Sequence, residues 1–140
     1  MNMKKNIVLI ATGTGIGPYL GMIRENNKKS NLHLYWGGRT KASFKLYKNQ
    51  IETQQKKGNI QSLHLAYSQE QNTKIYVQHL LNSDGDKIAK KLKNKGVIMI
   101  CGSVAMQNNV LEVLNHITTT KLQLPISFYI DNQVIKTDCY

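Results

Sequence analysis

Residues 13–18, with the sequence Gly-Thr-Gly-Ile-Gly-Pro, have the composition of a turn that binds phosphate. Gly13, Gly15 and Gly17 permit positive φ and let a ligand approach the backbone without meeting a Cβ atom. Pro18 suits the first position of a helix, where its missing N–H costs nothing. The backbone N–H groups of such a turn, with the helix dipole behind them, would face an anion. The segment therefore predicts nucleotide binding, and a tight turn without a ligand is the alternative that these residues leave open.

The spacing of this turn departs from the common dinucleotide fingerprint. In Gly-x-Gly-x-x-Gly the third glycine would stand three residues after Gly15, where this chain has Pro18. The apolar run 7–11 that precedes the turn suits a strand buried on both faces. A strand, a glycine turn and a helix thus follow one another in the order that nucleotide binding requires.

The elements that must position this turn follow from four apolar runs of strand length. They lie at 7–11, 32–36, 63–67 and 97–101. Segments with helical patterns separate or follow these runs, and we expect helices at 18–26, 45–57, 75–81, 84–94 and 104–118. The alternation predicts an α/β domain with a doubly wound parallel sheet, right-handed crossovers and helices on both faces.

Helix ends and the tail complete this organisation. Gly58-Asn59 and Lys95-Gly96 are expected to stop helices just before strands. The run 126–130 is ambiguous, because Pro125 could open a short helix or precede a strand. The chain shows no internal repeat or low-complexity linker, so residues 1–140 are expected to form a single domain.

Composition limits the partners of this domain. The net charge of +11, from 19 Lys and Arg against 8 Asp and Glu, fits a solvated lysine-rich surface, an anionic ligand or acidic protein, or nucleic acid.

Cys101 and Cys139 are too few and too far apart for a disulfide framework, and the four histidines share no metal-ligand spacing, so we assign no metal. No apolar stretch reaches the ~20 residues of a membrane span. We expect a cytoplasmic protein, or one at the cytoplasmic face of a membrane if a longer protein carries a membrane segment.

Several segments, taken in order, resemble the NADPH-binding domain of the ferredoxin-NADP reductase superfamily. The resemblance is to its diflavin branch, which includes the sulfite reductase flavoprotein subunit and nitric oxide synthase reductase domains, and it covers nearly the whole chain. The segments are Gly-Thr-Gly-Ile-Gly-Pro at 13–18, Tyr-Trp-Gly-Gly-Arg at 35–39, Ala-Tyr-Ser-Gln-Glu at 66–70, Lys-Ile-Tyr-Val-Gln at 74–78, Cys-Gly-Ser at 101–103 and Asp-Cys-Tyr at 138–140. It implies a five-stranded, Rossmann-like NADP-binding domain, with a short helix at 125–130 and an extended segment at 134–140.

The resemblance also implies a set of cofactor-binding residues. They are Gly13, Thr14, Gly15, Arg39, Ser68, Lys74, Tyr76, Gln78 and Gly102. Thr14 and the adjacent backbone would hold the pyrophosphate. Ser68, Lys74 and Tyr76 would take the 2′-phosphate and the adenine, since a hydroxyl and an ammonium suit a phosphate and a ring can stack on a base. Arg39 stands where an NAD-type domain would place an acid, which favours NADP.

Three further residues carry the catalytic roles that the resemblance implies. Cys101 would lie beside the nicotinamide C4, from which hydride leaves. Asp138 would balance the positive charge that grows on the ring as hydride departs. Tyr140 would cover the flavin ring until nicotinamide displaces it. The flavin carries the electron chemistry, and the protein orients the two rings.

The sequence departs from the family pattern at three positions and lacks one domain. Gln69 replaces an Arg beside the pocket Ser, Gly38 replaces a frequent Cys, and Ser103 replaces an acid. The Arg-x-Tyr-Ser motif of the FAD-binding barrel does not occur. We therefore expect FAD on another part of a longer polypeptide or on a separate chain.

The expected function is that of one module of an NAD(P)H-dependent flavoprotein reductase. The domain would present hydride from NADPH to FAD and be inactive without it. A flavodoxin-like, haem or iron-sulfur protein would accept the electrons. The alternatives are a dinucleotide sensor without catalysis and, from the charge alone, a basic nucleic-acid-binding module.

Overall fold

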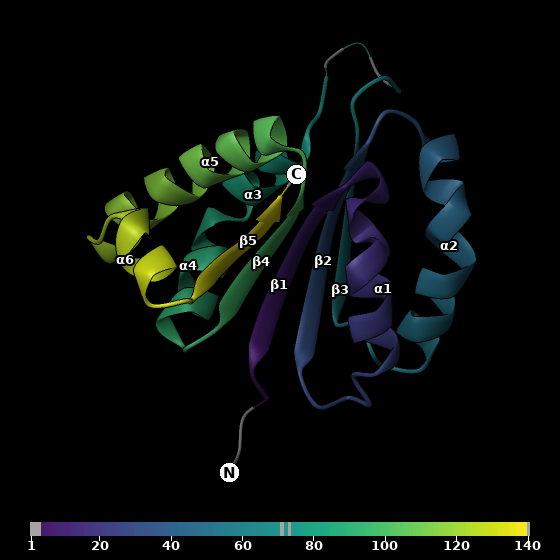
Figure 1. Cartoon of the computed structure of the whole chain (residues 1–140), viewed down its shortest axis with the longest axis horizontal. Helices are drawn as coiled ribbons and strands as arrows, with labels where there is room; N and C mark the ends of the chain where they lie inside the picture. Colours follow the sequence, from purple (N-terminus) through teal and green to yellow (C-terminus); the bar gives the residue numbers. More distant parts are fainter. Residues whose placement is uncertain (1–3, 71, 73, 140) are drawn as a thin grey trace.

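The computed structural model describes residues 4–70, 72 and 74–139, and these form one parallel sheet between two helical layers (Figure 1). The strands are β1 (Asn6–Thr12), β2 (Asn31–Gly38), β3 (Ser62–Tyr67), β4 (Val97–Gly102) and β5 (Ile135–Cys139). Their order in the sheet is β3-β2-β1-β4-β5, and every neighbouring pair is parallel. The chain therefore winds outward from β1 in both directions, which confirms the predicted doubly wound five-stranded sheet.

The helices lie on both faces of this sheet. A short 3-10 helix η1 (Gly13–Ile16) leads into α1 (Gly17–Arg24), and α2 (Lys41–Lys56) follows β2. The second layer contains α3 (Val77–Ser83), α4 (Gly85–Lys93), α5 (Val104–Leu122) and α6 (Ile126–Asp131). Figure 1 shows α1 and α2 on one side of the sheet and α3 to α6 on the other.

Two hydrophobic cores result, one on each face. Successive β1 side chains alternate between them: Leu9 packs in the α1–α2 core and Val8 and Ile10 in the α3–α5 core. Trp36 of β2 is fully buried in the first core, and Tyr35 belongs to the second. Burial on both faces explains why the strand sequences read as continuous apolar runs rather than as alternating patterns.

The first helices begin at different residues from those expected. The structure starts α2 at Lys41, not at residue 45, because Thr40 is extended and its N–H donates to Ser43 Oγ at 3.3 Å. Helix α1 begins at Gly17, so Pro18 is its second residue and not its first. Of the three glycines in the turn, Gly13 alone has a positive φ, of 52°. Gly15 and Gly17 do not use the positive φ that glycine permits, because Gly15 belongs to η1 and Gly17 to α1.

The other helices begin or end within a few residues of the expected positions. Helix α3 begins at Val77, not at residue 75, because Tyr76 is extended and acts as its N-cap. Helix α5 continues to Leu122, four residues past the expected end, and Gln123 ends it with a φ of 57°. Gly58 and Lys95 end α2 and α4 in left-handed conformations, which confirms both predicted stops. The tail forms α6 and β5, as the resemblance implied.

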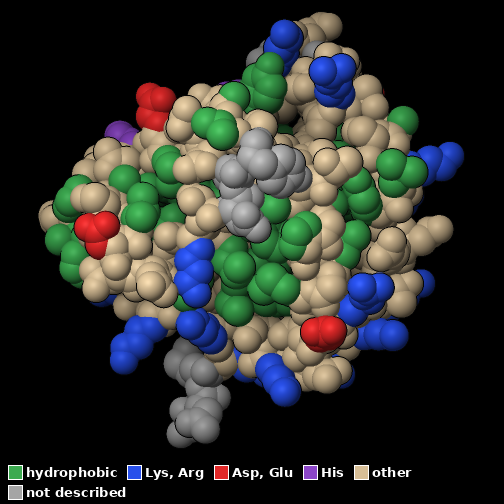
Figure 2. Space-filling model, in the orientation of Figure 1, with side chains coloured by type: hydrophobic (Ala, Val, Ile, Leu, Met, Phe, Trp, Pro, Cys, Tyr) green, Lys and Arg blue, Asp and Glu red, His purple; other side chains and the backbone are tan. Residues whose placement is uncertain are grey.

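On the face that Figure 2 shows, Lys and Arg side chains are scattered at the edges and within the face and do not gather in a single stripe. Within the described part of the chain, no helix combines the length and the apolar character that crossing a membrane requires.

Candidate functional site

A pocket of about 820 Å³ lies where four strands end. Its walls come from the carboxyl ends of β1 and β2 and from the residues that directly follow β3 and β4. The lining residues are Thr12, Gly13, Gly37, Gly38, Arg39, Ser43, Ser68, Ile75, Tyr76, Val77, Gln78, Ser103, Met106 and Asn109. The chain changes its winding direction between β1 and β4, and ligands of open α/β sheets bind at such a switch point. The volume suits a cofactor-sized molecule.

Gly13, the first residue of the glycine turn, lines this pocket, and the core holds the turn in place. Trp36 Nε1 donates a hydrogen bond to the Gly13 carbonyl oxygen at 3.0 Å. On the other side, Gly15 lies against β4: a Cβ atom there would stand 2.7 Å from the Cys101 carbonyl oxygen. The turn therefore fits between two strands only because residue 15 has no side chain.

A second wall brings together residues from β2 and from the segment after β3. Ser68 N–H donates to the Gly38 carbonyl at 2.9 Å, and Gln69 N–H donates to the Arg39 carbonyl at 2.8 Å. These two bonds continue the β2–β3 pairing past the end of the sheet. As a result Arg39 and Ser68 line the same pocket, and their guanidinium and hydroxyl groups are of types that suit a phosphate.

Tyr76 and Gln78 complete this end of the pocket from the start of α3. Tyr76 is the extended N-cap of α3, its N–H donates to His79 Nδ1 at 2.9 Å, and its ring tilts against the His79 ring. The side chain is 41% exposed, so its ring is available to stack on a flat ligand. Gln78 lies one residue into the helix and lines the pocket beside it.

The third wall is the first part of α5. Ser103 is its N-cap, with Oγ accepting from Met106 N–H at 3.2 Å, and both residues line the pocket together with Asn109. We did not assign Thr12, Ser43 or Asn109 from the sequence. A spacing of three residues from Ser103 to Met106 to Asn109 places all three on one side of a helix that starts at a strand end, and this signal could have identified Asn109.

Some predicted cofactor residues lie outside the pocket wall. Thr14 is exposed in η1 and Lys74 is exposed between β3 and α3, and neither lines the pocket. Gly102 does not line the pocket either. Its φ is 155°, and a Cβ atom at this residue would stand 2.8 Å from Thr12 Oγ1. Gly15, which belongs to η1, does not line the pocket either, and the roles of all four residues stay predictions.

The predicted catalytic residues lie at the ends of β4 and β5. Cys101 is buried on β4, and its backbone pairs in register with Asp138 of β5. The two residues are therefore neighbours on adjacent strands, and the backbone of Cys101 lies against Gly15. The structure describes the backbone of Asp138, and Tyr140 lies outside the described residues.

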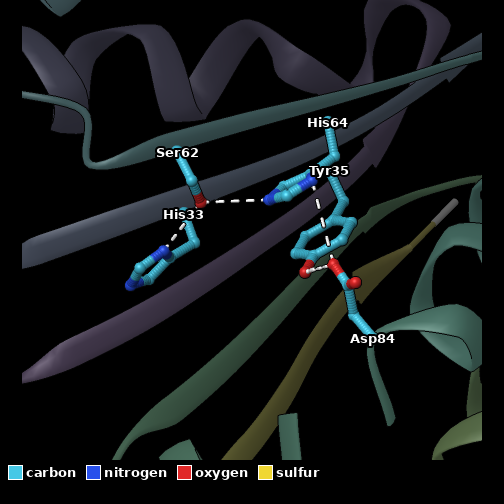
Figure 3. A network of polar contacts seen from close by, with 5 residues as sticks. All are labelled: His33, Tyr35, Ser62, His64 and Asp84. Atoms are coloured by element: carbon cyan, nitrogen blue, oxygen red, sulfur yellow. Dashed lines mark hydrogen bonds and ion pairs between the residues drawn. The ribbon is translucent and has the colours of Figure 1, made fainter. Parts of the chain in front are cut away.

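A separate polar network lies on the α3–α4 face of β2 and β3 (Figure 3). Ser62 Oγ lies 2.8 Å from His33 Nδ1 and 3.1 Å from His64 Nε2, while the Tyr35 hydroxyl donates to Asp84 Oδ2 at 2.6 Å. The His64 and Tyr35 rings stack with centroids 4.2 Å apart. These contacts tie the edge strand β3 to the α3–α4 junction.

The titration of this network follows from its burial. Burial, with smaller contributions from Lys91 and His64, lowers the pKa of His33 to about 4. Burial also lowers the pKa of His64, and burial and the Asp84 carboxylate raise the pKa of Tyr35.

Ser62, His64 and Asp84 have the residue types of the Ser-His-Asp triad of hydrolases. However, His64 Nδ1 lies 3.8 Å from Asp84 Oδ2, which is beyond hydrogen-bond distance. Because Ser62 Oγ is also within hydrogen-bond distance of His33 Nδ1, we interpret the network as structural.

The described residues were also compared with the ligand sets of metal sites. Over residues 4–70, 72 and 74–139, no group of three or more His, Cys, Asp or Glu side chains is arranged to hold a metal ion.

A doubly wound sheet with a pocket at its switch point defines a dinucleotide-binding domain. The model of the oxidoreductase NAD-binding domain family matches residues 9–112 of the chain. The chain belongs to this family.

Curated relatives narrow the similarity to reductases that use NADPH. The NADPH–cytochrome P450 reductase of Drosophila melanogaster is 35% identical over 124 residues, which are 82% of this chain and 18% of the relative. The enzymes of that name from Salmo trutta and Homo sapiens are 36% and 30% identical, each over 69% of this chain and over 17% and 15% of their own length. The chain thus spans less than a fifth of these relatives, and the similarity agrees with the diflavin resemblance.

Proposed function

We propose that this domain binds NADPH and presents its hydride to FAD held by another domain or chain. The observation that carries the proposal is the convergence of Gly13, Arg39, Ser68 and Tyr76 on one pocket from the three connections that follow β1, β2 and β3. Their chemistry fits the parts of NADPH: backbone N–H groups for pyrophosphate, a guanidinium and a hydroxyl for the 2′-phosphate, and a ring for adenine. NADP is favoured over NAD because Arg39, rather than an acid, follows β2.

The adenine end of the nucleotide would lie along the β3 side of the pocket. Arg39 and Ser68 bind the 2′-phosphate there, and Tyr76 stacks on the base. Lys74, which is exposed two residues before Tyr76, is a further cation on this side. Gln78 supports this pocket by hydrogen bonding. The pyrophosphate crosses the glycine turn, where η1 and α1 begin.

The nicotinamide end would then lie toward β4 and β5. Cys101 lies beside the ring, and Asp138 balances the positive charge that develops when hydride leaves C4. In this arrangement Tyr140 covers the flavin in the absence of nicotinamide. FAD, when bound by its own domain, supplies the conversion of a hydride into single electrons.

The partners follow from the same proposal. An FAD-binding domain, on the same longer polypeptide or on a separate chain, must meet the carboxyl edge of the sheet. A flavodoxin-like, haem or iron-sulfur protein would receive the electrons, and the names of the relatives, which pair NADPH with a cytochrome, support a haem acceptor.

Isothermal titration of the chain with NADP⁺ and NAD⁺ tests the binding step. We expect a single site with tighter binding of NADP⁺, and Arg39→Ala should weaken NADP⁺ binding about tenfold or more. Lys48→Ala, which removes one positive charge from the exposed side of α2 away from this pocket, is the matched control and should change neither affinity. Absence of binding of both nucleotides at millimolar concentration would overturn the proposal.

A further inference from the structure

Glu70 supplies a negative charge to the start of α2 from a different segment of the chain. Lys41 is the first residue of α2, and its N–H donates to a Glu70 carboxylate oxygen at 2.7 Å. The first turn of α2 contains no acidic residue of its own. Glu70 therefore occupies the positive end of this helix, where an anion is stabilised.

The same contact lies at the edge of the nucleotide pocket. Ser68, two residues before Glu70, lines the pocket, and so does Arg39, two residues before Lys41. Ser43, in the same first turn of α2 as Lys41, also lines it. The carboxylate is thus attached to both segments that provide the side chains for a phosphate.

Glu70 is the one acidic residue in these two segments. Residues 39–45 and 66–78 contain Arg39, Lys41, Lys45 and Lys74 as cations, and Glu70 opposes them. Its charge also reaches the end of β3, because the pKa of Tyr67 is raised by burial and, to a smaller extent, by Glu70. The carboxylate therefore reduces a positive potential that would otherwise attract an anionic ligand.

We propose that Glu70 is a specificity-determining residue that weakens the preference of this pocket for nucleotides with a 2′-phosphate. The inference rests on the proposed function and adds a determinant to it. A 2′-phosphate carries nearly two negative charges at neutral pH and is repelled by Glu70, whereas a 2′-hydroxyl is not. The pocket consequently accepts NADH more readily than its other side chains imply. Gln69, which is neutral, adds no charge to offset this effect.

The test is Glu70→Gln, with binding of 2′,5′-ADP and of 5′-AMP measured by isothermal titration. Gln keeps an oxygen that accepts from Lys41 N–H and removes the charge. We expect the affinity for 2′,5′-ADP to rise about threefold to tenfold, while the affinity for 5′-AMP changes less than about twofold. The gain should shrink as the salt concentration rises, because screening weakens a charge effect and not a packing effect.

Two further variants isolate the charge at this position. Glu70→Asp keeps the carboxylate and should retain the preference of the parent chain. Glu52→Gln removes the same charge from α2, where Glu52 faces Lys48 and not the pocket, and should leave both affinities unchanged.

The outcomes separate this inference from the proposed function. If 2′,5′-ADP binds the parent chain and Glu70→Gln binds it equally or more weakly, the role of Glu70 is overturned and NADPH binding stands. An equal gain for 5′-AMP would also overturn it, since the effect would not depend on the 2′-phosphate. If neither ligand binds any variant, the proposed function itself fails.

Discussion

The indole nitrogen of Trp36 donates a hydrogen bond to the carbonyl oxygen of Gly13, with 3.0 Å between the two atoms. Trp36 is fully buried in the α1–α2 core, and Gly13 is the residue of the turn with positive φ. The conformation of the turn is therefore coupled to the packing of the core beneath it.

Replacing Trp36 by Phe should separate these two contributions. The variant keeps an aromatic ring in the core and removes the donor to Gly13, so we expect about 1–3 kcal/mol less stability in urea unfolding. NADP⁺ affinity should fall about threefold or more, because the turn is less well fixed. Phe44→Leu perturbs the same core through the ring that packs on Trp36, and it should lower stability while the affinity persists. Equal affinity of Trp36→Phe and the parent would refute the coupling.

Gly15 and Gly17 should respond in opposite ways to Ala. A Cβ atom at Gly15 meets backbone atoms of Cys101 at 2.7 Å, so the turn must shift, and we expect a loss of about 1–3 kcal/mol together with weaker nucleotide binding. Gly17 has nothing within 4 Å of a Cβ atom and has helical φ, so Gly17→Ala should gain about 0.5–1 kcal/mol. Thermal unfolding of both variants checks the contrast, which similar melting temperatures would contradict.

Gln69→Arg should strengthen the selection of NADP⁺ over NAD⁺. The backbone of residue 69 is fixed by its bond to the Arg39 carbonyl, so a longer side chain starts beside the predicted phosphate site. One added charge-assisted hydrogen bond corresponds to about tenfold in affinity for NADP⁺ and little for NAD⁺. Titration with both nucleotides measures the ratio, and Gln69→Lys tests whether charge alone is sufficient. An unchanged ratio in both variants would place the 2′-phosphate elsewhere.

The stability of the fold should decrease with acid through His33. Its pKa is about 4 in the folded chain against an ordinary value of 6.5, so the unfolded chain binds the proton more readily between these values. The contribution is complete above pH 6.5 and is lost as the pH falls toward 4, and it amounts to about 2 kcal/mol between pH 7 and pH 5.

Urea unfolding at the two pH values measures this effect. In His33→Gln the difference between pH 7 and pH 5 should be smaller by about that 2 kcal/mol, and in the exposed-site variant His116→Gln it should equal that of the parent. An unchanged pH dependence in His33→Gln would assign the acid sensitivity to other groups.

The sequence predicts the sheet well because a strand buried on both faces has a simple sequence pattern, a continuous apolar run. Continuous apolar runs such as 97–101 predicted β1 to β4 in their places, whereas β5 was expected only from the family resemblance. The start of α2 was missed because its capping depends on the pair Thr40 and Ser43 and on Glu70, which is distant in sequence. No local pattern reports such a contact.

The site was predictable to the extent that its residues follow strand ends or belong to a family motif. Arg39, Ser68 and Tyr76, which the resemblance assigned to cofactor binding, line one pocket, and their binding roles stay predictions. Ser43 and Asn109 were not found, because each reaches the pocket from within a helix, and their positions depend on how α2 and α5 are placed on the sheet. Helix placement is a property of packing between layers and not of local sequence.

The strand order β3-β2-β1-β4-β5 places the two ends of the pocket on opposite sides of β1, so each end can change separately in evolution. In the proposed arrangement, the residues for the 2′-phosphate and the adenine follow β2 and β3, whereas Cys101 and Asp138 lie on the other side of β1. Because β1 separates the two groups of residues, the effects of substitutions in them on the free energy of nucleotide binding should be nearly additive. If so, a lineage of such domains can exchange its preferred coenzyme without rebuilding the end proposed to hold the nicotinamide.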